Sequence, residues 1–188
     1  LRNLERDLRN FVELWEDYAR AFGFISTSER APHYGSLSSL EAGRWLDRLD
    51  NLDLLTISRP ILSSSFLRMD IAGFESVARA CEIFTFRIYA VQGYRKDMNT
   101  AGILKLANEV LLTNKLGQYV LNRICTWLGK YSPMGAFLGK LADGEVKYAF
   151  DSRMRGWSYC YYFLYEYEVG YSPSGVSPLP WGKTRELK

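Results

Sequence analysis

The regular spacing of apolar residues between positions 74 and 92 limits the fold of this chain more than any other feature of its sequence. Apolar side chains recur there in steps of three and four, at Phe74, Val77, Cys81, Phe84, Ile88 and Val91. This spacing places them on one face of an α-helix, because successive turns bring such positions together. Gly93 follows directly, and glycine commonly follows the end of a helix. We therefore expect a helix over 74–92 that buries one face.

A second stripe of this kind lies near the N-terminus. It consists of Leu4, Leu8, Phe11, Trp15, Tyr18 and Phe22, again in steps of four and three. Charged side chains occupy the opposite face of the predicted helix, and Gly23 predicts its end. Residues 26–39 are rich in Ser, Pro and Gly, which is typical of a loop.

Further helices are predicted from shorter patterns along the chain. Ser39 is a candidate cap for a helix over 40–55, and Pro60 is placed at the first position of a helix that runs to Leu67. The remaining predicted helices cover 99–113, 116–128 and 132–143, with another turn or two over 147–153. The expected fold is all-α, an irregular bundle of about seven helices.

The aromatic run Gly156 to Glu168 contains the densest group of large side chains in the chain. Its tyrosines alternate as in a half-buried strand, but helical spacing also fits. No partner strand is evident, and buried backbone groups must be paired, so a helix is favoured. Because aromatic side chains bury large apolar areas, we expect this run to be the central packing element.

The chain of 188 residues is expected to form one helical domain, residues 1–169, with a tail rich in Pro, Gly and Ser over 170–188. It begins with Leu1 rather than Met, and its charged C-terminal residues close no predicted element. We interpret it as a piece of a longer protein, with neighbouring domains on both sides.

The composition excludes several classes of protein. Three scattered cysteines, Cys81, Cys125 and Cys160, without a C-x-x-C pair predict reduced, buried thiols in a cytoplasmic protein. One histidine, His33, in a loop-like segment makes a zinc site or a serine-nucleophile triad a poor fit. No apolar run is long enough to span a membrane.

Motifs for cofactor chemistry are also missing. The chain has no phosphate-binding loop, dinucleotide fingerprint or H-E-x-x-H helix. Gly182-Lys183-Thr184 lacks the glycine and strand that precede a phosphate loop. The carboxylate pairs Asp50 with Asp53 and Glu166 with Glu168 fit solvated faces or partners of arginines better than acid–base catalysis. No catalytic residue, cofactor or metal ligand is therefore assigned in this chain.

Basic residues give the one candidate binding surface. The net charge is +3, which permits an acidic partner such as nucleic acid without requiring one. Candidate nucleic-acid contacts flank the helix over 74–92 and the aromatic run; they are Arg87, Arg95, Lys96, Arg153, Arg155, Lys183 and Arg185. Ordinary surface charge paired with carboxylates is the alternative interpretation.

Two segments, Phe84–Tyr89 and Tyr162–Glu168, resemble the helical region of GmrSD-type restriction proteins. The Phe86-Arg87 pair matches a Phe-Arg pair on one helix of that family. Phe163-Leu164 followed by Glu168 matches an aromatic-Leu-x-x-x-Glu pattern on a later helix. The resemblance covers the chain from about Phe74 onward, and residues 4–55 fit more loosely.

The resemblance implies a role between two domains that this chain lacks. In the family, a ParB/sulfiredoxin-like nucleotide-binding domain precedes the helical region and an HNH-like nuclease domain follows it. Neither the nucleotide-binding motif nor the Glu-His-Ile-x-Pro-Gln sequence of the nuclease occurs here. The expectation is thus a connecting scaffold in a bacterial cytoplasmic protein that cuts modified DNA, its nucleoside triphosphate and divalent metal bound by the neighbouring domains.

Two other functions remain open from the sequence. The chain can instead be a stand-alone helical module that binds a protein partner, with Tyr171 and Trp181 as aromatic anchors. A small enzyme with an unrecognised site is the third possibility, and the scarcity of histidine and of metal-ligand spacing speaks against it.

Overall fold

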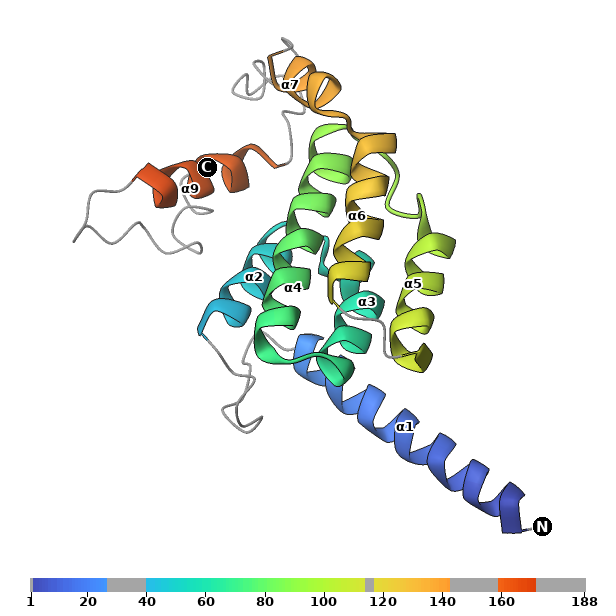
Figure 1. The fold of residues 1–188 in the computed structure, drawn as a ribbon. Helices are drawn as coiled ribbons and strands as arrows, with labels where there is room; N and C mark the ends of the chain where they lie inside the picture. Colours follow the sequence, from blue (N-terminus) through green and yellow to red (C-terminus); the bar gives the residue numbers. More distant parts are fainter. Residues whose placement is uncertain (1, 27–39, 114–116, 143–158, 172–188) are drawn as a thin grey trace.

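The computed structural model describes residues 2–26, 40–113, 117–142 and 159–171, and within these ranges the chain is helical without any strand. The predicted all-α fold is confirmed (Figure 1). The elements are α1 (Arg2–Ser26), α2 (Leu40–Asn51), α3 (Leu55–Arg68), α4 (Ile71–Thr85), the π-helix η2 (Phe86–Val91), α5 (Thr100–Thr113), α6 (Gly117–Tyr131), α7 (Met134–Ala142) and α9 (Cys160–Tyr171).

Helix α4 lies at the centre of the bundle, between α2 and α6 and against α3 (Figure 1). The predicted stripe over 74–92 is confirmed, because all six of its apolar residues are at most 4% exposed. Asp70 caps the helix, accepting a hydrogen bond from the backbone N–H of Gly73 at 2.8 Å. The ring of Phe74 meets Phe66 of α3 edge-on, with centroids 5.5 Å apart.

The winding of the predicted helix changes near its C-terminal end. The α-helical part ends at Thr85, and η2 continues the same stripe as a π-helix. The buried Thr85 hydroxyl is 2.9 Å from the carbonyl oxygen of Cys81, to which it donates. Apolar spacing did not reveal this change, because Ile88 and Val91 continue the three-four steps of α4 and are buried in the π-helix as well. Gly93 ends the element with a positive φ of 73°, as predicted.

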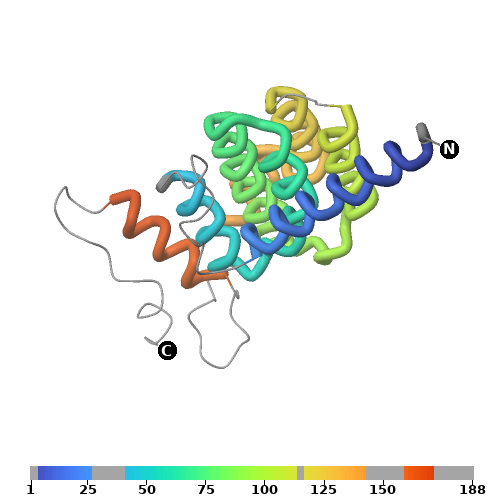
Figure 2. The backbone as a smooth tube through the Cα atoms, turned by 90° about the horizontal axis from the view of Figure 1, so that it is seen from below, coloured from blue at the N-terminus to red at the C-terminus, as the bar shows by residue number. Residues whose placement is uncertain are grey.

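Helix α1 joins the bundle at its C-terminal end, and its N-terminal half extends away from the other helices (Figures 1 and 2). Ala21, Phe24 and Ile25 are buried, and α1 packs mainly on α3. The predicted stop at Gly23 is wrong, since the helix continues to Ser26. Burial of Phe24 and Ile25 outweighs the cost of about 1 kcal/mol for a glycine within a helix.

The boundary between the next two helices also differs from the prediction. Helix α2 ends at Asn51, because Asp53 adopts a left-handed φ of 55° and the N–H of Leu54 bonds to the carbonyl of Leu49 at 3.2 Å. Helix α3 begins at Leu55, so Pro60 lies inside it and not at its first position. Proline there removes a helical hydrogen bond, and burial of the apolar side of α3 offsets the loss.

The three helices after Gly93 fall close to their predicted ranges, as α5, α6 and α7. Helix α5 buries Ile103, Leu106, Ala107 and Val110, and α6 buries Val120, Ile124 and Trp127. Predicted turns over 147–153 lie outside the described residues.

The described part of the aromatic run, from residue 160 on, forms the helix α9, as favoured, but this helix is not the centre of the fold. Only Cys160 and Tyr162 of α9 are buried, and Tyr161, Phe163, Leu164, Tyr167 and Tyr171 are exposed by 37% to 74%. The prediction that this run is the central packing element is wrong. Helix α4 occupies that position. Tyrosine hydroxyls need polar partners or water, so a tyrosine-rich helix is better placed at the edge. The tail from 172 onward lies outside the described residues.

The cysteines are free, and two of the three are buried as predicted. Cys125 is exposed, which corrects the expectation for that residue. Burial raises the pKa of Cys81 to about 12, so its thiol stays protonated at neutral pH. None of the described helices is both long and apolar enough to span a membrane.

Candidate functional site

Helix α9 is attached to the bundle by a cluster of charged and aromatic side chains. We call this the junction cluster; it contains Arg48 of α2, Arg79 and Glu82 of α4, and Tyr162 and Glu166 of α9. The Tyr162 hydroxyl donates to Oε1 of Glu82 at 2.6 Å. The Arg48 guanidinium is 2.8 Å from Oε2 of Glu166, with both side chains partly buried. The cluster therefore connects helices that are far apart in sequence.

Aromatic contacts support the same junction. Phe86, at the start of η2, lies 5.7 Å from the ring of Tyr162, centroid to centroid. It also faces Phe163 at 6.5 Å with nearly parallel rings. On the other side, the guanidinium of Arg48 lies over the Trp45 ring at 4.4 Å. Such contacts hold the charged groups in one geometry and shield them from water.

Burial dominates the electrostatics of the junction cluster. It raises the pKa of Glu82, and the hydrogen bond from Tyr162 and the charges of Arg48 and Arg79 oppose this rise. The pKa of Glu166 is also raised by burial, opposed by Arg48 and reinforced by Glu82. Burial and the two carboxylates raise the pKa of Tyr162, so its phenol remains a donor. Two carboxylates thus lie among two arginines and one phenol.

This arrangement suits attachment better than catalysis. Shifted carboxyl pKa values are typical of active sites, but structural ion-pair networks shift them too. Here the Tyr162 phenol is hydrogen-bonded to Glu82, and Arg48 forms an ion pair with Glu166. Of the carboxylate pairs considered from the sequence, Glu166 lies in this cluster and Asp53 accepts from Lys96 at 3.1 Å. We interpret the cluster as the anchor of α9.

Arg87, the first predicted nucleic-acid contact, makes its contacts within the protein. Its Nη2 donates to the backbone carbonyl of Ser132, and its guanidinium lies over the Phe137 ring at 4.8 Å. These contacts tie η2 to the start of α7. The phosphate-binding role predicted for Arg87 therefore has to compete with two partners inside the chain.

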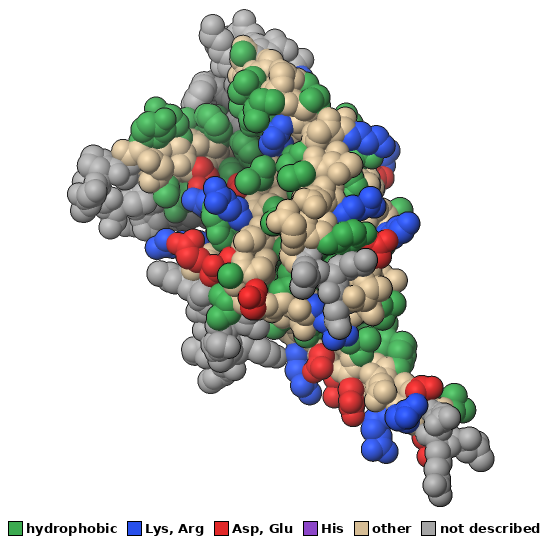
Figure 3. All heavy atoms as spheres, viewed as in Figure 1, with side chains coloured by type: hydrophobic (Ala, Val, Ile, Leu, Met, Phe, Trp, Pro, Cys, Tyr) green, Lys and Arg blue, Asp and Glu red, His purple; other side chains and the backbone are tan. Residues whose placement is uncertain are grey.

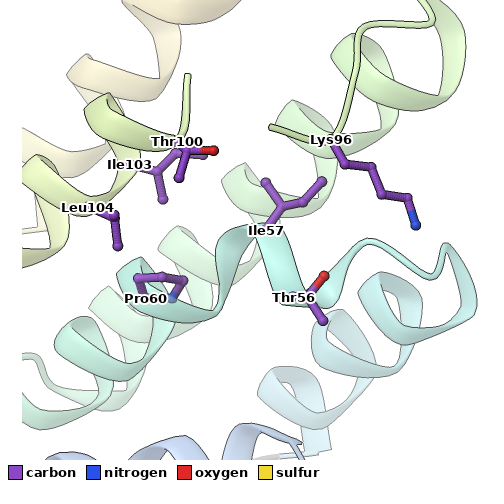
Figure 4. A pocket seen from close by; sticks show the side chains of 7 residues that line it. All are labelled: Thr56, Ile57, Pro60, Lys96, Thr100, Ile103 and Leu104. Atoms are coloured by element: carbon purple, nitrogen blue, oxygen red, sulfur yellow. The ribbon is translucent and has the colours of Figure 1, made fainter. Parts of the chain in front are cut away.

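Arg95 and Lys96 lie in the turn after Gly93 and have acidic neighbours. Arg95 is 87% exposed and 3.0 Å from Asp97. Lys96 donates to both the carboxylate and the carbonyl of Asp53, each at 3.1 Å. It borders a mainly apolar cavity of about 210 Å³, with Pro60 and Leu104 among the other lining residues (Figure 4). That cavity has no second cation and does not resemble an anion site.

Within the described part of the chain, the predicted basic residues already have partners. Arg87 contacts Ser132 and Phe137, whereas Arg95 and Lys96 face the carboxylates of Asp97 and Asp53. Figure 3 shows Lys and Arg side chains scattered among acidic ones on the face it presents. Arg153, Arg155, Lys183 and Arg185 lie outside the described residues. Contact of these seven side chains with DNA stays a prediction.

The sequence did not single out the residues of the junction cluster as a group. Glu166 was noted only as half of a carboxylate pair. Glu82 adjoins the apolar stripe of the central helix, and a carboxylate at such an edge is a weak signal for a buried partner. Nothing in the local pattern of α2 links Arg48 to a helix more than a hundred residues away, because only packing decides such a pair.

Comparison with known proteins adds no identity to this geometry. No group of three or more His, Cys, Asp or Glu that could hold a metal occurs among the described residues. No protein-family model, curated protein or solved structure matches the chain.

Proposed function

We propose that this chain is a helical connecting scaffold within a DNA-targeting, modification-dependent restriction protein of the GmrSD type. Its work is to hold a nucleotide-binding domain and an HNH-like nuclease domain in a fixed relation. The observation that supports this is the packing of the two resembling segments: Phe86 contacts Tyr162 and Phe163. These segments lie some 75 residues apart in the chain, and the packing of α9 against η2 brings them together.

The junction cluster supplies the mechanical part of the proposal. A domain that follows α9 is coupled to the bundle only as firmly as α9 itself. The ion pair of Arg48 with Glu166 and the hydrogen bond of Tyr162 to Glu82 fix that helix to α2 and α4. Partly buried, mutually satisfied polar contacts are specific in geometry, so they suit a junction that must keep one orientation.

In this proposal DNA, nucleoside triphosphate and divalent metal bind mainly to the neighbouring domains, in a bacterial cytoplasm. Of the basic residues predicted to contact DNA, Arg95 and Lys96 are the two described ones that we propose add phosphate contacts, because both are more than half exposed. Arg87 instead stabilises the turn before α7.

The first test is the coding sequence on both sides of the chain. The proposal expects a ParB/sulfiredoxin-like motif upstream and a Glu-His-Ile-x-Pro-Gln motif shortly after Lys188. If neither motif is encoded there, the restriction function is wrong.

The second test uses the longer protein and asks whether the junction couples its domains. Tyr162→Phe removes the hydroxyl that reaches Glu82, and Tyr161→Phe removes an exposed hydroxyl from the same helix as a matched control. Tyr162→Phe should weaken nucleotide-stimulated cleavage of modified DNA, while Tyr161→Phe should not. Equal cleavage by both variants, with faster amide exchange in α9 only for Tyr162→Phe, would remove the coupling role.

DNA contact is tested separately by charge reversal. Arg95→Glu with Lys96→Glu should weaken DNA affinity and flatten its dependence on salt. Unchanged affinity and salt slope would confine both residues to structural roles.

A stand-alone protein-interaction module is the second candidate, and the exposed apolar side of α1 favours it. Leu4, Leu8, Phe11, Val12 and Trp15 are 53% to 60% exposed. Of the predicted anchors, Tyr171 is 74% exposed and Trp181 lies outside the described residues. Size-exclusion and DNA-shift measurements on the purified chain separate this candidate from the first.

A further inference from the structure

The first turn of α7 presents backbone donors to solvent at one end of the bundle (Figure 1). Met134, Gly135 and Ala136 are exposed, and no other described residue accepts a hydrogen bond from their N–H groups. The next N–H, that of Phe137, is bonded to the carbonyl of Pro133 at 2.9 Å. Proline has no side-chain acceptor, so Pro133 cannot cap the helix that follows it. The free N–H groups carry the partial positive charge of a helix N-terminus.

A buried hydroxyl at the same end of α7 also lacks a partner. Ser132 is 0% exposed, and its Oγ makes no hydrogen bond within the described part of the chain. At the start of α4, by contrast, the Asp70 carboxylate accepts from the N–H of Gly73 and satisfies that helix end. Buried polar groups are nearly always paired, so the orphaned Ser132 hydroxyl points to a ligand at the start of α7.

Two cations add their charge to this helix end. Arg87 donates to the backbone carbonyl of Ser132 and lies over the Phe137 ring at 4.8 Å. Lys130, exposed near the end of α6, lies over the neighbouring Tyr131 ring at 4.8 Å. Neither cation forms an ion pair with a carboxylate among the described residues, and the first turn of α7 has no acidic residue. The charges of both therefore reinforce the helix dipole.

We propose that the N-terminus of α7 binds one phosphate group of the DNA backbone. The N–H groups of Gly135 and Ala136 are the direct donors, and Ser132 supplies a hydroxyl beside them. A phosphate has several acceptor oxygens and matches such a set of converging donors. The choice of DNA as the source of the phosphate rests on the function proposed above; the phosphate site itself does not.

This site gives the contacts of Arg87 a further consequence. Arg87 is a positioning residue here, because its bond to the Ser132 carbonyl and its contact with Phe137 hold the first turn of α7 in place. Its charge stays beside the phosphate without needing to touch it. A single exposed contact of this kind positions a protein on the DNA backbone and carries no sequence information.

A titration of the purified chain with inorganic phosphate, followed by amide NMR, tests the site. The wild type should show saturable shifts centred on Gly135 and Ala136. Gly135→Glu places a carboxylate among the donors, and a side chain fits there because a Cβ at Gly135 meets nothing within 4 Å. Since an acidic residue stabilises a helix N-terminus, this variant should keep α7 folded while binding phosphate about tenfold more weakly.

Gly135→Gln is the matched neutral control, and it should bind phosphate nearly as well as the wild type. Lys130→Gln removes an exposed cation and should weaken binding with unchanged helical circular dichroism. Absence of saturable shifts in the wild type would overturn the site. Equal phosphate binding by Gly135→Glu and Gly135→Gln would overturn it as well.

A DNA duplex titrated at several salt concentrations tests the source of the phosphate. Gly135→Glu should weaken duplex binding and lower the salt slope by about one relative to Gly135→Gln. If Gly135→Glu impairs phosphate binding but leaves duplex binding unchanged, the site takes free phosphate and its assignment to DNA is wrong. Failure of the restriction function is seen separately, in the flanking coding sequence, and leaves the phosphate titration unaffected.

Discussion

Helices α1 and α4 carry nearly the same pattern of apolar residues, yet one of them is exposed and the other is the centre of the fold. In α4 the stripe is at most 4% exposed, and Phe74 and Val77 are completely buried. In α1 the same spacing leaves Leu8 and Phe11 at 56% and 57%. The spacing therefore specifies a helix with one apolar face, and it does not specify what covers that face.

The difference arises from the position of each helix among its neighbours. Helix α4 has α2, α3 and α6 around it, whereas α1 is held by its C-terminal end. The two helices also offer matched substitutions, because each contains a phenylalanine of its stripe and a valine, Phe11 and Val12 in α1 and Phe74 and Val77 in α4. The predictions below use this match.

The largest effect is expected from Phe74→Ala in α4. Phe74 is fully buried and packs edge-on against Phe66, so the truncation leaves a cavity beside that ring. The free energy of unfolding should fall by about 3–5 kcal/mol in urea denaturation. The matched variant Phe11→Ala should cost less than about 1 kcal/mol when the chain is monomeric. Similar costs for both would mean that α1 is covered in solution as fully as α4.

An intermediate effect is expected where α4 meets α9. Tyr162→Phe leaves the partly buried Glu82 without its hydroxyl donor, which should lower the free energy of unfolding by about 1–3 kcal/mol. Tyr161→Phe should be neutral, since Tyr161 is exposed. Amide exchange in α9 should quicken only in Tyr162→Phe; slow exchange in both would separate the anchoring of α9 from this hydrogen bond.

The pH dependence of stability gives a smaller effect at the same place. The pKa of Glu82 is raised above 4.5 by burial, so the folded state binds this proton more tightly than the unfolded state. The stabilisation is complete below 4.5 and is lost as pH rises through the folded pKa. Relative to Glu82→Gln, the wild type should therefore lose stability between acid and neutral pH. If the difference in urea midpoint between the wild type and Glu82→Gln does not change with pH, the Glu82 carboxyl is exposed to water in the folded state.

The smallest effect is expected for Val12→Ala, which should change the free energy of unfolding by no more than about 0.5 kcal/mol, because Val12 is exposed. The change should be stabilising, because alanine has a higher helix propensity than valine. The same substitution in α4, Val77→Ala, should cost about 2 kcal/mol, because Val77 is 0% exposed. Thermal melts of both variants at low protein concentration check this. A large loss of stability in Val12→Ala would mean that this side of α1 is covered in solution.

Local sequence patterns were sufficient to predict most of the described helices. Three-four spacing predicted α1, α4 and α5, and the position of Gly93 predicted the end of η2. Errors arose where a longer-range contact prevailed over a local signal. Gly23 does not end α1, because Phe24 and Ile25 reach the core, and Pro60 does not begin α3, because the chain has already turned at Asp53.

The junction cluster could not be predicted in the same way. Each of its residues is ordinary on its own helix, and their pairing depends on α2, α4 and α9 meeting in space. The composition of the aromatic run suggested the centre of the core. Its tyrosines instead occupy the edge, where their hydroxyls reach Glu82 or water.

The sequence by itself determined that this chain is a set of amphipathic helices, because backbone hydrogen bonding and the period of the side chains are local properties. Only the tertiary structure decided which apolar face is buried and which carboxylate meets which arginine. Those outcomes depend on how the helices share a limited interior, and no single helix carries that information.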